Sequence, residues 1–160
     1  MKVDMRTRTM LVTAVVAAAL VAPSEAAAVK NFSGKTQQNR SINLSIGDDQ
    51  LLETARINWI TRRCAQSGSR FQHITAFRRP YDSATPDAFT DAGSFTVRDR
   101  GRIRSRVRIT FAGQRTFDPA NPAAETWNGT LKANVVVRRR GRVIDRCRLR
   151  EITWTATLTP

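Results

Sequence analysis

Cysteine and histidine are scarce in this chain of 160 residues, which holds two cysteines and one histidine. Structural zinc sites and iron–sulfur clusters usually need four such ligands, and small disulfide scaffolds need a dense set of cysteines. The sequence also lacks the G-x-S-x-G and H-E-x-x-H motifs and a glycine-rich phosphate loop. His73, near Phe71 and Phe77, has no accompanying nucleophile motif and is interpreted as a packed or rim residue. We therefore expect a non-enzymatic protein with no catalytic residue, metal or cofactor.

Lysine is rare as well. The 27 basic residues are 23 arginines and 4 lysines against 13 acidic residues, so the formal net charge is +14. Apolar residues make up 41% and charged residues 25%, which is typical of a folded domain and not of a disordered chain. High-GC coding also produces an excess of arginine without selection for binding. Composition therefore predicts a basic folded domain and leaves its partner open.

Only one long hydrophobic run occurs, and it lies near the amino terminus. Lys2, Arg6 and Arg8 precede twelve residues, 11–22, in which Thr13 is the only polar side chain. A basic start, a short apolar run and small residues after it are the order of a secretory signal peptide. Twelve helical residues at about 1.5 Å each fall short of a hydrocarbon core of about 30 Å, so we expect no transmembrane segment after processing.

Cleavage is predicted after Ala28, with Ala26 as the alternative position and Met5 as an alternative start of the chain. The predicted organisation is a signal peptide over residues 1–28 and a single disulfide-bonded β domain over residues 29–160. The expected location is outside the cell or at its envelope, as a secreted protein.

Apolar and polar residues alternate along most of the remaining chain. From Ile103 to Phe111, for example, odd positions are mostly apolar and even positions are mostly arginine, which is the pattern of a half-buried β strand. No comparable run of helical period occurs after residue 30. The alternation predicts eight strands, over residues 31–36, 41–46, 51–62, 70–77, 94–99, 102–111, 126–138 and 142–158.

These strands follow one another mostly with short connections. Longer loops are expected at two proline pairs, Pro80 with Pro86 and Pro119 with Pro122. The predicted fold class is therefore all-β, an antiparallel meander of about eight strands that forms either a β-barrel or a β-sandwich. Alternation alone does not distinguish these two architectures.

The apolar positions of the last predicted strand change parity along its length. Leu149 belongs to an odd-numbered set, whereas Ile152 belongs to an even-numbered one. A β-bulge near Arg150 and Glu151 would return both sets to one face of the sheet.

Cys64 and Cys147 are separated by 83 residues, from 147 − 64. Because the export compartment is oxidising, we expect them to form a disulfide. Closing a loop of this length stabilises the folded state by up to about 4–5 kcal/mol in the chain-entropy account. A reactive thiol is the alternative, with His73 as the one available base.

Arginines concentrate in the second half of the chain. Those between residues 98 and 108 fall at even positions, and apolar residues such as Val107 and Ile109 fall at odd ones. If these residues form a hairpin, the arginines share its outer face. Guanidinium groups bind phosphate and sulfate bidentately, so this face is the candidate polyanion-binding surface. It comprises Arg98, Arg100, Arg102, Arg104, Arg106 and Arg108.

Two other interpretations of these arginines stay open. Solvent-facing strand positions must be polar, and basic edges also deter pairing between sheets of different molecules. A further arginine group lies at residues 138–150. The expected partner is an anionic envelope polymer or polysaccharide. Nucleic acid is disfavoured because no aromatic residues interleave with the arginines.

The three tryptophans, Trp59, Trp127 and Trp154, all take inward-facing positions in the predicted strands. Their expected role is core packing. In a barrel they could instead line an apolar cavity, which makes a carrier of a small apolar ligand the alternative function. A hydrolase is a third possibility. The sequence specifies neither the ligand nor the oligomeric state.

Several short motifs occur in a fixed order along the chain. They are Phe32-Ser33-Gly34-Lys35-Thr36, Trp59 with Cys64, Trp127-Asn128-Gly129-Thr130-Leu131, the segment from Gly141 to Cys147, and Thr153-Trp154-Thr155-Ala156. In these motifs the chain resembles small secreted two-cysteine all-β proteins of high-GC actinobacteria. The resemblance implies secretion and a paired-cysteine β domain, and it supplies no activity. Many members carry Thr-Gly after the second cysteine, where this chain has Arg148 and Leu149.

Overall fold

The computed structural model describes residues 29–159, and every regular element in that part of the chain is a β strand. The strands are antiparallel neighbours in a single sheet with the order β4-β3-β2-β1-β9-β8-β7-β6-β5. Their bounds are β1 (Lys30–Thr36), β2 (Ser41–Ile46), β3 (Leu52–Ile60), β4 (Gln72–Arg78), β5 (Ser83–Ala84), β6 (Ala88–Asp99), β7 (Ile103–Asp118), β8 (Asn121–Arg139) and β9 (Arg142–Leu158).

The predicted signal peptide and both of its cleavage positions lie outside the described residues. Within residues 29–159 there is no helix with the length and apolar character needed to cross a membrane.

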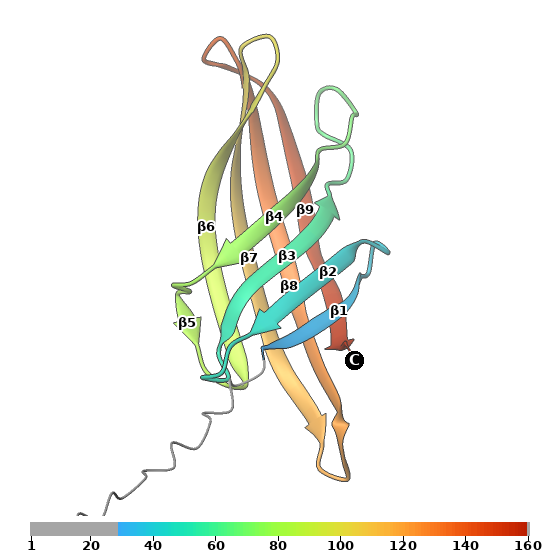
Figure 1. Cartoon of the computed structure of the whole chain (residues 1–160). Coiled ribbons are helices and arrows are strands. Elements are labelled where there is room, and N and C mark those ends of the chain that lie inside the picture. The colour runs from blue at the N-terminus through green and yellow to red at the C-terminus, as the bar shows by residue number, and fades with distance from the viewer. Residues whose placement is uncertain (1–28, 160) are drawn as a thin grey trace, which may run out of the picture.

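The sheet curls on itself into a half-barrel, with the short strands β1–β4 crossing at an angle over the long strands β6–β9 (Figure 1). Strand β1 pairs with β2 on one side and with β9 on the other, so it connects the two halves of the sheet. The curl brings β4 onto β7, where the rings of Phe77 and Phe111 stack with centroids 4.5 Å apart. The predicted all-β antiparallel class is confirmed, and the architecture is one curled, barrel-like sheet.

Residues of alternating phase on both halves fill the concave side of the curl. The largest buried side chains are aromatic or branched aliphatic, and each loses nearly all of its contact with water. Burial of this apolar area is the main contribution to stability, at roughly 25 cal/mol per Å². The side chains that are almost completely buried include Trp59, Trp127, Trp154, Phe32, Phe111, Ile42, Ile46, Leu52, Ile57, Leu131, Leu149 and Val107.

One cross-strand row of this core depends on two glycines. Phe89 on β6, Gly113 on β7, Gly129 on β8 and Trp154 on β9 are paired in register across four adjacent strands. Because the two glycines have no side chains, the rings of Phe89 and Trp154 lie over their backbone and stack at 6.2 Å. A methyl group at Gly129 would overlap the indole of Trp154.

The predicted bulge in the last strand is confirmed. Leu131 on β8 pairs with Ile152, and Ala133 pairs with Leu149, so Arg150 and Glu151 on β9 together oppose a single residue of β8. The buried positions of β9 change parity across this point, as the pattern predicted.

The strand count and several boundaries differ from the prediction. Residues 29–159 form nine strands and not eight, because the pattern did not predict the two-residue β5. In addition, β6 begins at Ala88 and not at residue 94. The loop expected around Pro119 and Pro122 is a tight hairpin end, with β7 extending to Asp118 and β8 beginning at Asn121. Beyond its last pair with β9, at Thr126, β8 is an edge strand, and edges tolerate proline.

Candidate functional site

Four of the six arginines predicted to share a face do so. Arg98 lies on β6, and Arg104, Arg106 and Arg108 lie on β7, all exposed on the convex side and alternating with buried or half-buried residues. Arg98 and Arg104 are directly opposite each other in the β6–β7 register.

Arg100 and Arg102 depart from the prediction. They belong to the turn between β6 and β7, because Asp99 pairs with Ile103 and leaves three residues to reverse the chain. Gly101 and Arg102 have φ angles of 73° and 63°, which is the left-handed conformation such a turn requires. These two arginines therefore lie in the turn at the end of the hairpin and not on the outer face of its strands.

The β7 arginines face a second row of arginines on β9. The register aligns Arg106 with Val136 and Arg146, while Arg108 aligns with Asn134 and Arg148. The two arginine rows thus lie on either side of β8, about 9.6 Å apart at a strand spacing of about 4.8 Å. Sequence reasoning noted the second arginine group but did not join it to the first. The shared even numbering along all three strands was the available signal.

A groove of about 680 Å³ lies between these rows. Its middle is formed by the β8 residues Asn134 and Val136. Along each row, neighbouring guanidinium-bearing residues repeat about every 6.7 Å, since every second strand residue faces the same side. The arginines that line it are Arg106, Arg108, Arg138, Arg146 and Arg148.

Within residues 29–159, no ion pair neutralises the charges of this groove. The ion pairs between described residues involve Lys30, Arg79 and Arg115, and none of the groove arginines pairs with a described carboxylate. Arg104 pairs in register with Arg98 on one side and Arg138 on the other, which places three like charges side by side. Like charges directly opposite each other destabilise a sheet, so bound anions would relieve this repulsion.

The predicted disulfide is confirmed and lies directly behind the groove. Cys147 on β9 faces the concave side, between the outward residues Arg146 and Arg148, and bonds to Cys64 in the loop that follows β3. That loop also pairs with the edge of β9, where the amide of Ala65 donates to the carbonyl of Arg146 at 2.9 Å. The strand that carries the second arginine row is therefore fixed by a covalent bond on its concave side and by hydrogen bonds at its edge.

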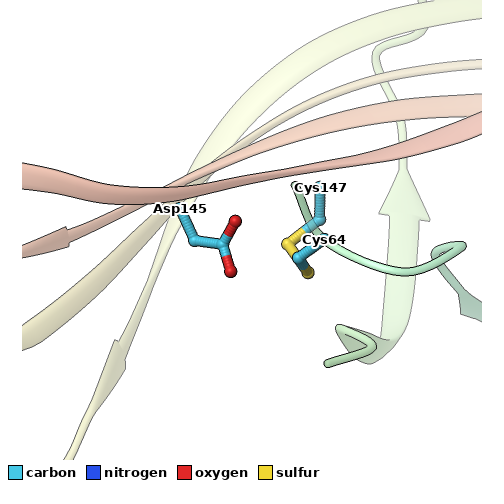
Figure 2. A group of neighbouring side chains, drawn as sticks. All are labelled: Cys64, Asp145 and Cys147. Atoms are coloured by element: carbon cyan, nitrogen blue, oxygen red, sulfur yellow. A yellow bond between two sulfur atoms is a disulfide. The ribbon is translucent and has the colours of Figure 1, made fainter. Parts of the chain in front are cut away.

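Asp145 lies on β9 beside this disulfide, and its carboxylate points to the same side of the strand (Figure 2). Its carboxylate accepts hydrogen bonds from the amides of Gln66 at 2.9 Å and Ser67 at 3.1 Å, and from the Ser67 hydroxyl. These hydrogen bonds lower the pKa of Asp145 to about 2, and the one from the Gln66 amide has the largest effect. Each donor stabilises the charged carboxylate.

The same three residues, Cys64, Asp145 and Cys147, have potential ligand atoms within 4.8 Å of one another. Both sulfur atoms are consumed by the disulfide, and the carboxylate is already occupied by N–H and O–H donors. The donor set therefore does not fit a metal ion, because thiolates are the form in which cysteine binds metals.

The three tryptophans lie in the packed core. Trp59 donates from Nε1 to the hydroxyl of Thr75 at 2.9 Å, while Trp127 and Trp154 pack against Phe89. None of the three lines the arginine groove. The Nε1 atoms of Trp127 and Trp154 are buried and have no hydrogen-bond partner among the described residues.

His73 lies half-buried on β4. Its ring contacts Phe71 and Phe95, with centroids 6.0 and 5.0 Å away, and burial lowers its pKa. Nδ1 lies 3.3 Å from the Thr75 hydroxyl. The disulfide leaves no described cysteine free to act with this histidine as a nucleophile.

Comparison of the chain with protein-family models, with curated proteins and with solved structures gave no match. The resemblance to secreted actinobacterial proteins therefore stays a prediction from the sequence.

Proposed function

We propose that this chain is a non-enzymatic binding protein that acts at or outside the cell envelope and holds a linear anionic polymer in the groove across β7, β8 and β9. The observation that carries the proposal is the register that aligns Arg106 with Arg146 and Arg108 with Arg148 on either side of β8. A buried disulfide is consistent with an oxidising compartment, where envelope polymers are found.

The chemistry of the groove favours repeated anionic groups over single small molecules. Two parallel rows of guanidinium groups can bind successive phosphate, sulfate or carboxylate groups of one chain, each through paired N–H donors. The residues between the rows are Asn134 and Val136, so no aromatic surface is offered there for base stacking. This composition supports a phosphate-linked or sugar-acid polymer as the ligand in preference to single-stranded nucleic acid.

A salt titration with long-chain polyphosphate and the chain of residues 29–160 tests this proposal. If four groove arginines each release a counterion, the association constant should fall about a hundredfold between 50 and 200 mM salt. The double variant Arg106→Ser with Arg146→Ser should bind more weakly and show a shallower salt dependence, since roughly half of these contacts are lost. Both side chains are exposed, so the melting temperature should not fall.

The matched control removes two exposed arginines from the other half of the sheet, Arg56 on β3 and Arg78 on β4. It has the same net charge as the groove variant, so equal losses in both would show a nonspecific charge effect and contradict a groove. Binding that ignores salt and quenches tryptophan fluorescence would instead support the carrier of an apolar ligand.

A further inference from the structure

The turns of the two long hairpins lie side by side at one end of the sheet (Figure 1). The amide of Arg140, in the β8–β9 turn, donates to the carbonyl of Arg102, in the β6–β7 turn, at 3.3 Å. Both residues adopt the left-handed conformation, with φ angles of 48° and 63°. The two turns therefore form one joint surface, which we call the hairpin end.

This hairpin end carries a high density of positive charge. Asp99 is the one acidic residue in the two turns and the strand positions beside them, and its carboxylate accepts a hydrogen bond from the Arg100 amide at 2.8 Å. The arginines are all exposed. They are Arg98, Arg100, Arg102, Arg104, Arg138, Arg139, Arg140 and Arg142.

Exposed apolar side chains lie among the arginines of the hairpin end. Val143 and Ile144 are 37% and 42% exposed, and half-buried Ile103 lies close by in the register. A register shift causes the exposure of the first two. Arg138 pairs with Val143 while Val137 pairs with Asp145, so Ile144 is an extra residue without a partner on β8.

We propose that the hairpin end binds the surface of an anionic lipid bilayer. Guanidinium groups attract lipid phosphates, while Val143 and Ile144 enter the boundary between headgroups and acyl chains. A soluble polyanion would use the arginines but gain nothing from the two aliphatic side chains. Their presence at the most basic point of the chain is the reason for choosing a bilayer. This surface is separate from the groove, apart from Arg138, which belongs to both.

The test measures co-sedimentation of residues 29–160 with vesicles of phosphatidylcholine containing 30% phosphatidylglycerol, and with vesicles of phosphatidylcholine alone. We expect binding to the anionic vesicles and little to the neutral ones. The variant Val143→Ser with Ile144→Ser keeps every charge and should lose at least tenfold in affinity for the anionic vesicles, because two aliphatic side chains no longer leave water. Its affinity for polyphosphate should be unchanged.

Two further variants separate the contributions. Arg100→Ser with Arg142→Ser should weaken vesicle binding by about 25-fold, at about fivefold for each arginine near an anionic surface. Ile74→Ser is the apolar control, since Ile74 is 46% exposed on β4, and it should leave vesicle binding unchanged. Circular dichroism and the melting temperature verify that each variant is folded.

Three results would overturn the bilayer proposal. They are absence of binding to anionic vesicles, equal binding to neutral vesicles, and full vesicle binding by the Val143 and Ile144 variant. Full vesicle binding by that variant would mean that the arginines bind vesicles as they bind any polyanion, with no contribution from the two aliphatic side chains. None of these results affects the groove, whose test uses polyphosphate and the Arg106 and Arg146 variant.

Discussion

At the scale of single residues, Gly129 is a core position that has no room for even one added methyl group. An alanine there would place its methyl group against the carbonyl of Ala112 and the indole of Trp154, and the backbone contact cannot move away cheaply. We expect Gly129→Ala to lower the free energy of unfolding by about 2–3 kcal/mol, as overpacked cores do. The shift of the urea midpoint measures this.

Gly93 supplies the control for this substitution, because it lies in β6 with open space around the position of a methyl group. Gly93→Ala should leave the urea midpoint unchanged or slightly raised, since alanine reduces the freedom of the unfolded chain. A similar loss of stability in both variants would show that replacing any strand glycine destabilises the sheet. The contact with Trp154 would then not be the cause of the loss at Gly129.

Asp145 makes stability depend on pH at the acidic end. Its pKa is lowered to about 2 by the hydrogen bonds from Gln66 and Ser67, whereas an aspartate in an unfolded chain has a pKa of about 3.9. Since the folded-state value is the lower one, the stabilisation is complete above about pH 4 and is lost as the pH falls to about 2. Melting temperatures of the wild type and Asp145→Asn between pH 6 and pH 2 measure it.

The two melting curves should be separated by a constant difference near neutral pH and should converge as the pH approaches 2. A constant difference down to pH 2 would mean that the carboxylate charge is not what holds the 61–71 loop on β9. Added salt should change little, because the donors are mostly backbone amides and carry no full charge.

At the scale of strands, alternation of side chains was a sufficient signal wherever one face is buried. It placed the outward arginines of β7 correctly, and the parity change in β9 located the bulge at Arg150 and Glu151. It failed at β5 and at the first half of β6, where a two-residue strand and the small or polar residues around Gly93 carry little pattern. The first half of β6 is a strand because it pairs with β7, and β5 is a strand because it pairs with β6.

Alternation in the sequence was also insufficient to predict the groove. Arg106 and Arg146 share their even parity in the sequence, but only the register across β8 shows that they flank the same residue, Val136. This register depends on the lengths of the β7–β8 and β8–β9 turns, which have two residues after Asp118 and two after Arg139, and on a second irregularity at Ile144. These are differences of one residue, and a shift by one residue would move a whole row of arginines to the other face.

At the scale of the whole molecule, a single strand pair joins the two halves within the sheet. β1 pairs with β9 through five register positions, from Phe32 with Leu158 to Thr36 with Trp154. The disulfide is a second connection, because Cys64 lies in the loop between β3 and β4 and Cys147 lies in the middle of β9. It therefore links the halves at a point that the β1–β9 pairing does not reach.

Replacing both cysteines, as Cys64→Ser with Cys147→Ser, should lower the free energy of unfolding by up to about 4–5 kcal/mol, because an 83-residue loop is no longer closed in the unfolded chain. Urea unfolding monitored by tryptophan fluorescence measures the loss. Hydrogen exchange then locates it. Amides of the loop over residues 61–71 should exchange faster, while those of the β7–β8 hairpin keep their relative protection, since the long ladder between these strands does not depend on the bond. Equal acceleration throughout residues 29–159 would show that the sheet folds as a single unit, and the disulfide would then be no local clamp on the arginine row of β9.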